Sequence, residues 1–216
     1  MEILFLGTCA CDYSPLLQTT YKDVFDKNAR RSSCALINGR YLIDCGYHCL
    51  EELRIAKIDL AQITDIFVTH FHSDHYGNVL NIINNYKVKT IYLKNYHGLD
   101  GTTSSGYQSN EEYIEHEMSI YNTIIATCKA NKISIIYIDD FDTDIYTINF
   151  ENVNLELYDC KNRLYNLYID PKSQYYMQKR FNENFNSIAV FIKHNNYNIF
   201  LGGDVTCSSF DFEPVK

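Results

Sequence analysis

Residues 69–78, Thr-His-Phe-His-Ser-Asp-His-Tyr-Gly-Asn and here called the histidine segment, constrain the fold more than any other part of the chain. The apolar, β-branched run at residues 66–69 predicts a buried strand. The run at residues 79–83 has the apolar spacing of a helix. The chain must therefore turn from a strand into a helix through a connection that is rich in histidine.

Four side chains in this connection are of the types that bind first-row divalent metals, and they are His70, His72, Asp74 and His75. Residues two apart on an extended backbone point to the same side, so His70 and His72 can share one metal. Asp74 and His75 follow at the turn into the helix, where they can face a second metal. An isolated histidine in a strand is usually a packed or surface residue, but four such side chains at this spacing predict a metal site.

The order His-x-His-x-Asp-His resembles the signature of the metallo-β-lactamase superfamily, whose members are mostly dinuclear metallohydrolases. The resemblance implies an α+β fold, namely a four-layer αββα sandwich with two mixed sheets. The expected order of strands, then a helix, then strands again fits this sandwich better than a doubly wound sheet, because hairpins lie at both ends. We expect residues 1–216 to form one such domain, with a second half that is incomplete at the C-terminus.

Apolar spacing and turn residues predict most of the secondary structure. Strands are expected at residues 3–6, 33–37, 40–44, 90–93, 133–138, 144–150, 153–158, 187–193 and 198–201, and helices at 50–57, 79–83 and 110–130. Asn38-Gly39 predicts a two-residue hairpin turn. Polar segments predict loops at 9–31, 97–106 and 160–186, the last with a short helix at 175–181.

The composition of the 216-residue chain excludes some functions. Hydrophobic residues make up 46% of it, which is typical of a globular protein. The net charge of −8 argues against a broad basic surface for duplex DNA. A phosphodiester substrate stays open, because bound metal ions add local positive charge that a formal count omits.

The chain carries no signal for export or for the membrane. No basic segment precedes its short N-terminal apolar run, and no stretch approaches the roughly eighteen apolar residues of a membrane span. The eight cysteines form no Cys-x-x-Cys pair, and Cys9 and Cys11 make a Cys-x-Cys that is a weak metal signal. We therefore expect a reduced, cytoplasmic protein with mostly structural thiols.

Two aspartates elsewhere join the predicted site. Asp204 follows Gly202-Gly203 at the end of an apolar strand, where a close backbone approach and an exposed carboxylate are both needed. It matches the aspartate that bridges the metals in the superfamily, although alone it would be an ordinary turn residue. Asp44 is similar to an aspartate of ribonuclease Z and the phosphoribosyl cyclic phosphodiesterases that orients the metal-binding loop, although a strand-end turn acid is its alternative role. Residues 184–187 are similar to the DNA-uptake nuclease branch.

Two histidines of the superfamily pattern have no clear counterpart. His194 is the only histidine between His116 and Asp204, and the predicted hairpin places it roughly 20 Å from Asp204. Asp159 or Cys160 lies nearer to the expected position, although an inert buried cysteine is the more common arrangement. No histidine is among the twelve residues after Asp204. Either the chain is shortened, or a second copy or another partner completes the site, or the site works without that ligand.

The remaining residues supply two ligand sets that share Asp204. One metal would have His70, His72 and Asp204, and the other would have Asp74, His75 and Asp204. With a bridging hydroxide each metal reaches four ligands, the number that zinc prefers. We expect two zinc ions, the second bound more weakly, and manganese is the alternative metal.

These residues predict a metal-dependent hydrolase, and the resemblance favours a phosphodiester substrate, either in a nucleic acid or in a small cyclic molecule. The resemblance assigns Asp74 the catalytic role of passing a proton to the leaving group. Two alternatives stay open. One is a degenerate metal-binding module that scaffolds a partner, and the other is a thioester or lactam hydrolase of the same fold.

Other polar residues carry weaker signals. The loops at 9–31 and 97–106 are candidates to frame the substrate. Four basic residues of the first loop could contact a phosphate, although solvated charges are the more common role, and they are Lys22, Lys27, Arg30 and Arg31. Three histidines are isolated, and no catalytic role is predicted for them: His48, His97 and His116.

Overall fold

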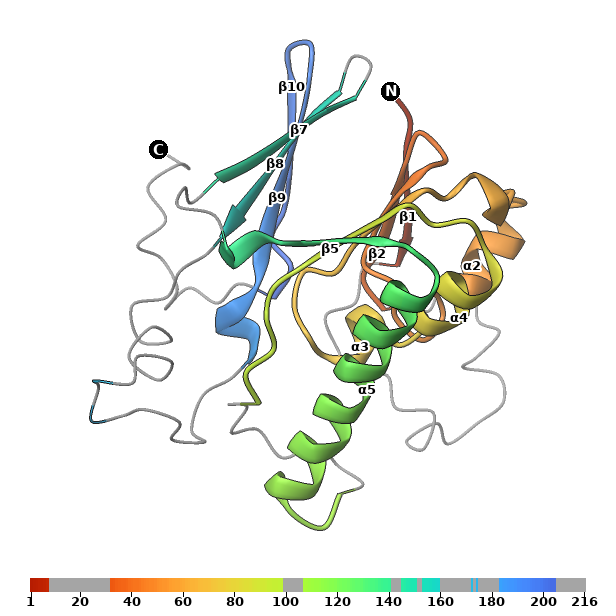
Figure 1. The fold of residues 1–216 in the computed structure, drawn as a ribbon. Coiled ribbons are helices and arrows are strands. Elements are labelled where there is room, and N and C mark those ends of the chain that lie inside the picture. The colour runs from red at the N-terminus through yellow and green to blue at the C-terminus, as the bar shows by residue number, and fades with distance from the viewer. Residues whose placement is uncertain are drawn as a thin grey trace.

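The computed structural model describes residues 1–7, 32–98, 107–140, 145–150, 153–159, 172, 174 and 183–204. In these residues the strands form two sheets that face each other, and the helices lie on the outer side of the larger sheet (Figure 1). This arrangement confirms the predicted α and β composition and the sandwich of two sheets.

The larger sheet has six strands in chain order. They are β1 (Ile3–Gly7), β2 (Cys34–Ile37), β3 (Tyr41–Ile43), β4 (Asp65–Phe67), β5 (Thr90–Leu93) and β6 (Ser134–Tyr137). The pairs β1–β2 and β2–β3 are antiparallel, whereas β3, β4, β5 and β6 run parallel. The sheet is therefore mixed, as predicted, and its parallel part includes β4, which leads into the histidine segment.

The turn between β2 and β3 forms at Asn38-Gly39, as predicted. Both residues have positive φ values, 49° and 67°, which suit a two-residue turn between twisted strands. The backbone N–H of Arg40 donates to the carbonyl of Ile37 at 3.0 Å and closes the turn. The side chain of Asn38 accepts a hydrogen bond from the backbone of Glu2, so the turn also holds the start of β1.

The smaller sheet has four strands, in the order β10-β9-β8-β7, and its described pairs are all antiparallel, so this sheet is not mixed, contrary to the prediction. The strands are β7 (Ile145–Phe150), β8 (Val153–Asp159), β9 (Ile188–His194) and β10 (Tyr197–Leu201). Leu155, Val190 and Ile192 are buried against the larger sheet. Glu156 and Lys193 alternate with them and form an ion pair of 2.6 Å on the other face. The alternation of apolar and polar residues along these strands therefore decides which face of the smaller sheet packs against the larger sheet.

Four described α-helices cover the larger sheet, and they are α2 (Cys49–Ile55), α3 (Ser73–Tyr76), α4 (Val79–Asn85) and α5 (Asn110–Ala130). The described residues also form the short 3-10 helices η2 (Leu60–Gln62), η3 (Ile138–Asp140) and η4 (Glu183–Asn186). Helix α5 begins after Ser109, whose hydroxyl accepts a hydrogen bond from the backbone of Glu112. Among the described helices, none has an apolar stretch of the length needed to cross a membrane.

Two apolar cores separate the layers. The first lies between the helices and the larger sheet and includes Leu42, Ile66 and Ile91. The second lies between the sheets and includes Phe67 and Leu155. Ile66 and Phe67 are neighbours in β4 that belong to different cores, so both faces of the strand are covered. This explains why the run that contains them is continuously apolar rather than alternating.

Some predicted boundaries shift, and some lie outside the described residues. β3 ends at Ile43, because Asp44 has φ 58° and leaves the extended conformation. The strand expected at 133–138 is β6, which ends at Tyr137 because η3 begins at Ile138. The loop at 9–31, the helix at 175–181 and most of the loops at 97–106 and 160–186 fall outside the described residues.

Removing a buried methyl-rich side chain from the core between the sheets should destabilise the fold. Ile192 is fully buried, so Ile192→Ala should lower the free energy of unfolding by about 2–5 kcal/mol, measured by urea denaturation. Ile55 is 64% exposed, so the same chemical change at Ile55 should alter it by less than about 0.5 kcal/mol. Equal losses at the two positions would contradict the assignment of Ile192 to the core.

Candidate metal centre

The histidine segment lies where the ends of the two sheets meet. The carbonyl of Thr69 accepts a hydrogen bond of 2.7 Å from the backbone N–H of Ile188, the first residue of β9. Gly203, just past β10, has φ 55°, and a Cβ added there would lie 3.1 Å from the Thr69 side chain. Glycine at this position therefore lets Asp204 approach the histidine segment.

Asp44 holds the histidine segment through three hydrogen bonds. One carboxylate oxygen accepts from the backbone N–H of Thr69 at 2.8 Å. The other accepts from the Thr69 hydroxyl at 3.0 Å and lies 2.8 Å from Nδ1 of His75. Asp44 is 2% exposed, so water competes little for these bonds. The structure thus places Asp44 against the histidine segment, and its orienting role toward a metal stays a prediction.

The turn of α3 is packed against the loop that follows Asp44. A Cβ on Gly46 would lie 1.9 Å from the carbonyl oxygen of Asp74, so only glycine fits there. The backbone N–H of Cys45 donates to the carbonyl of His75, and the side chain of Asn78 donates to the carbonyl of Gly46. Gly46 and Asn78 position the site but were not assigned a role from the sequence. Glycine and asparagine are so common in turns that neither residue stands out in the sequence.

His70, His75 and Asp204 come together in the centre of the site. One ligand atom from each lies within 4.8 Å of the others. Nε2 of His75 is 3.6 Å from one Asp204 oxygen, and Nε2 of His70 is 4.0 Å from the other. The two oxygens of Asp204 therefore face different histidines, as a carboxylate between two cations would.

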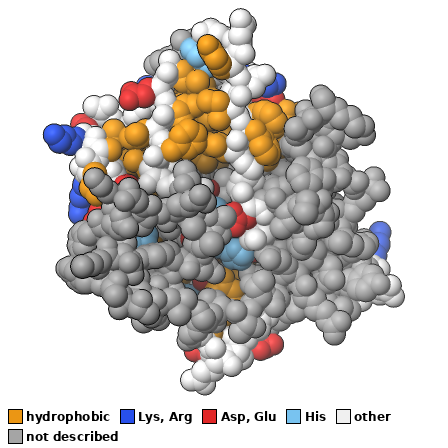
Figure 2. Space-filling model, turned by 180° about the vertical axis from the view of Figure 1, so that it is seen from behind, with side chains coloured by type: hydrophobic (Ala, Val, Ile, Leu, Met, Phe, Trp, Pro, Cys, Tyr) orange, Lys and Arg blue, Asp and Glu red, His pale blue; other side chains and the backbone are white. Residues whose placement is uncertain are grey.

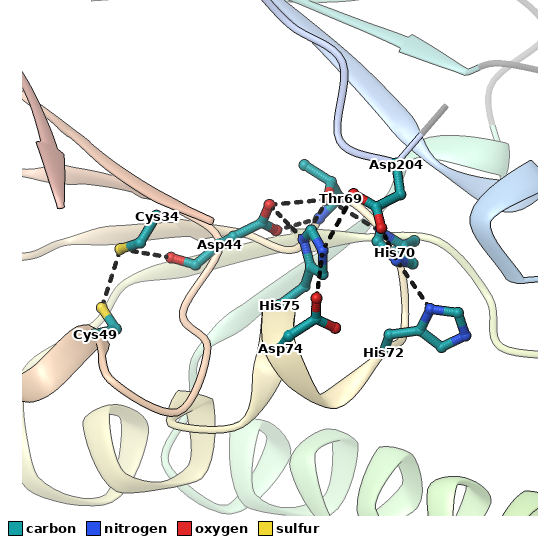
Figure 3. A network of polar contacts seen from close by, with 9 residues as sticks. All are labelled: Cys34, Asp44, Cys49, Thr69, His70, His72, Asp74, His75 and Asp204. Carbon is teal, nitrogen blue, oxygen red and sulfur yellow. Dashed lines mark hydrogen bonds and ion pairs between the residues drawn. The ribbon is translucent and has the colours of Figure 1, made fainter. Parts of the chain in front are cut away.

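Figure 3 shows Asp74 next to His75 and His72 next to His70, both on the side of the group away from Asp204. Nδ1 of His72 is 3.2 Å from Nε2 of His70, and an Asp74 oxygen is 3.4 Å from Nε2 of His75. Proximity thus pairs His70 with His72 and His75 with Asp74. This is the division into two ligand sets expected from the sequence, although the metal-binding role of these residues stays a prediction.

Nearby charges push the pKa values of the two central histidines in opposite directions. Burial, helped by the charges of His75 and His72, holds the pKa of His70 well below its usual range, so His70 is a neutral imidazole at pH 7. Burial would also lower the pKa of His75. The charge and hydrogen bond of Asp44, with those of Asp74, outweigh burial and raise the pKa of His75 well above its usual range.

The two carboxyl groups of the site also differ. Burial would raise the pKa of Asp74, but its hydrogen bond with His75 and the charge of that residue outweigh burial and lower it. Burial raises the pKa of Asp204, and the charges of Asp74 and Asp44 add to this effect against that of His75. A bound cation would favour the ionised form of both carboxyl groups, because its positive charge offsets the cost of burying their negative charge.

The donor set fits zinc. Nε2 of His75 is buried between a carboxylate oxygen of Asp74 at 3.4 Å and one of Asp204 at 3.6 Å, and neither contact is a well-aligned hydrogen bond. A cation bound between these three atoms would satisfy them better than the imidazole proton does. Imidazole nitrogens and carboxylate oxygens are ligands that zinc accepts readily, and manganese accepts the same set.

Asp159, proposed from the sequence for the missing third histidine position, is engaged elsewhere. It ends β8 and forms a buried ion pair of 2.6 Å with Nζ of Lys94, which follows β5. His194 lies at the turn of the β9–β10 hairpin, where its Nε2 is 3.1 Å from the Asn195 amide. The central group of His70, His75 and Asp204 includes neither residue.

Seen from behind, acidic and histidine side chains are visible together near the centre of the face, below a band of hydrophobic side chains (Figure 2). The sequence candidates in the first loop cannot be placed around them, because Lys22, Lys27, Arg30 and Arg31 lie outside the described residues, as does Cys160. The chemistry of the site is therefore assigned from the residues around Asp204 alone.

Comparison with known proteins matches the chain to one family. Residues 28–161 match the family described as the Metallo-beta-lactamase superfamily, which is more than half of the chain. A Thermotoga maritima protein assigned to the metallo-beta-lactamases has a crystal structure that is similar over 93% of this chain and 76% of its own, with a TM-score of 0.51 and 16% identity. That likeness supports the same fold.

Shorter stretches of sequence are similar to ribonuclease Z proteins. The chain is 36% identical over 77 residues to the ribonuclease Z of Methanothermobacter thermautotrophicus and 32% identical over 83 residues to that of Rippkaea orientalis. These matches cover 35% and 38% of this chain. The chain spans only about a quarter or less of the curated relatives, 21% and 24% of their length.

Asp44→Asn should weaken zinc binding by about 10- to 100-fold, because Asn presents an N–H where His75 needs an acceptor. Competition with a chromophoric chelator measures the affinity. Asp59→Asn is the matched control, because Asp59 caps η2 and an asparagine caps equally well. An unchanged affinity in Asp44→Asn would contradict the orienting role of this carboxylate.

Zinc binding should release about one proton from His75 at pH 7. The raised pKa of His75 keeps this proton on the metal-free protein below that pKa, and the proton is lost only as pH rises through it. Zinc affinity should therefore increase with pH. Calorimetry in two buffers of different ionisation enthalpy counts the proton, and Asp44→Asn, which removes the main cause of the raised pKa, should release less. A count near zero in the unaltered protein would contradict this assignment.

Proposed function

Because the chain belongs to the metallo-β-lactamase superfamily, we propose that it is a metal-dependent hydrolase of phosphodiester bonds. The observation that carries the proposal is the position of Asp204, whose two oxygens face His70 and His75 separately. A carboxylate so placed can hold two cations side by side, and paired metal ions suit the displacement of an oxygen from phosphorus.

His70, His72 and Asp204 would hold one zinc ion, and Asp74, His75 and Asp204 the other. Bound zinc lowers the pKa of a water molecule and neutralises charge that develops on the substrate. Asp44 accepts from Nδ1–H of His75, so the lone pair of Nε2 is directed into the site. Burial of His70 and His75 keeps competing water away from the ligands.

Asp74 would move the proton. Its lowered pKa keeps it ionised at neutral pH, so it can accept a proton from the attacking water. The carboxyl group of Asp74 can then donate that proton to the leaving oxygen. The carboxylate reaches this position because α3 begins at Ser73 and directs Asp74 toward His75.

The phosphodiester substrate is supported by similarity and by charge. The curated relatives are ribonuclease Z proteins, but the match covers a small part of their length, so the substrate is inferred rather than transferred. The net charge of −8 disfavours a broad basic platform for nucleic acid, so bound metal ions would supply the positive charge that a phosphodiester meets. A short single strand or a small cyclic phosphodiester fits these features.

Turnover of bis-p-nitrophenyl phosphate by the zinc-loaded protein tests the proposal. Asp74→Asn should reduce kcat by about 10²- to 10⁴-fold, because it removes the proton acceptor. His72→Ala should also reduce turnover, and His194→Ala is the control at the far hairpin turn.

A zinc-loaded protein that hydrolyses no phosphodiester would contradict the proposal and favour a role as a metal-binding scaffold. Turnover of thioesters or lactams instead would identify a different hydrolase of the same fold. Turnover that survives both Asp74→Asn and His72→Ala would show that the activity arises elsewhere.

A further inference from the structure

Three buried cysteines surround the backbone of Asp44, and the proposed hydrolase mechanism uses none of them. Cys34 lies in β2, Cys45 directly follows Asp44, and Cys49 begins α2. All three are free thiols and at most 3% exposed. Sγ of Cys34 is 3.1 Å from Sγ of Cys49, and Cys45 is also hydrogen-bonded to Cys49.

One of these thiols contacts Asp44 itself. Sγ of Cys34 donates to the carbonyl oxygen of Asp44 at 3.3 Å, so Cys34 lies between Cys49 and Asp44 (Figure 3). The carboxylate of Asp44 in turn holds Thr69 and His75. A chemical change at the thiols can therefore shift His75, a candidate metal ligand, through Asp44 alone.

The thiols lie on the helix-facing side of β2, because Cys34, Cys45 and Cys49 belong to the core between the helices and the larger sheet. A cavity of about 250 Å³ lies on the other side of β2, where its lining includes Ala35, Ile43 and Thr69. Since a water molecule occupies roughly 30 Å³ in the liquid, hydrogen peroxide fits this space, and local opening of the strand would admit it to the thiols.

The thiols differ in acidity in a way that suits a two-step oxidation. The side-chain contacts with Cys34 and Cys45 lower the pKa of the Cys49 thiol to about 5. Burial, with the contact to Cys49, raises the pKa of Cys34 well above its usual range. Cys49 is therefore the better nucleophile toward peroxide, because the thiolate is the reactive form.

We propose that Cys34 and Cys49 form a reversible disulfide when the protein meets a peroxide, and that this modification weakens metal binding through Asp44. The second half of the inference rests on the proposed metal site, whereas the disulfide does not. Transient, regulatory disulfides of this kind occur in proteins that are otherwise kept reduced.

The chemistry balances in two steps. The Cys49 thiolate attacks hydrogen peroxide, the O–O bond breaks, and hydroxide leaves and is protonated to water, so Cys49 becomes a sulfenic acid. The sulfur of Cys34 then attacks the Cys49 sulfur, the S–S bond forms, the S–O bond breaks, and the leaving hydroxide takes the thiol proton of Cys34 and becomes water. Two thiols lose two electrons in total, and one peroxide is reduced to two waters.

The disulfide would disturb Asp44 in two ways. The sulfur atoms must approach from 3.1 Å to about 2.05 Å, which moves β2 and α2 relative to each other at this point. The oxidised sulfur also has no hydrogen to donate to the carbonyl of Asp44. Asp44 has φ 58°, a conformation that non-glycine residues adopt only when their contacts hold them there, so the loss of one contact matters.

Peptide mapping of the full chain after treatment with hydrogen peroxide tests the disulfide. Trypsin cuts after Arg31, Arg40 and Arg54, so Cys34 is alone in peptide 32–40 and Cys45 and Cys49 share peptide 41–54. The expected product is a cross-link between these two peptides that dithiothreitol reverses and that also forms in Cys45→Ser. A link within peptide 41–54, or no link, would overturn the proposal.

Chelator competition on the same samples tests the coupling. Oxidation should weaken zinc affinity about tenfold, and dithiothreitol should restore it. Cys49→Ser should form no cross-link and lose the response to peroxide, and Cys34→Ser, which keeps a hydroxyl donor near Asp44, should do the same if Cys49→Ser folds poorly. Cys128→Ser is the matched control, because Cys128 is buried in α5 away from this cluster, and it should respond normally.

A cross-link that leaves zinc affinity unchanged would overturn the regulatory role. Both readouts are independent of turnover. A protein that forms the cross-link and binds zinc more weakly when oxidised, but hydrolyses no phosphodiester, would contradict the proposed function alone.

Discussion

The hydrogen bonds of the Asp44 carboxylate are the interaction on which the rest of the site depends. They hold the backbone and hydroxyl of Thr69 and the ring of His75 at once. They also join the end of β3 to the end of β4, whose backbones already meet where Asp44 N–H donates to Phe67. Because the carboxylate is buried, each bond is stronger than it would be in water. The strained φ of Asp44 is the conformation that directs the carboxylate inward.

The second requirement is the close contact between the two sheets. The bond from Ile188 to Thr69 anchors β9 on the histidine segment, and Gly203 lets the end of β10 pass against the same threonine. Asp204 reaches His70 and His75 only because both contacts exist. Thr69 thus contacts the ends of strands from both sheets. Its small β-branched side chain suits a position where three backbone segments meet.

Much of this arrangement could be predicted from local patterns. The apolar run before the histidine segment, the Asn38-Gly39 turn and the alternation in β8 and β9 each follow a period or a turn rule. Strand boundaries were less predictable. The strand that contains Ile43 ends before Asp44, because Asp44 has a positive φ and its carboxylate is held by residues distant in the sequence. Gly46 and Asn78 went unassigned, because their role is to allow α3 to pack closely, and no local pattern carries that information. The Cys34–Cys49 contact likewise joins residues that no spacing rule connects.

The sequence by itself determined which side chains are of the types that bind metal and that a strand and a helix flank them, because ligand chemistry and hydrophobic period are local properties. Tertiary structure alone decided which ligands share a neighbourhood. It placed one Asp204 oxygen toward His70 and the other toward His75, and it engaged Asp159 with Lys94 instead. The physical reason is that contacts between distant residues depend on how two sheets pack. That packing is set by the summed burial of both cores rather than by any one segment.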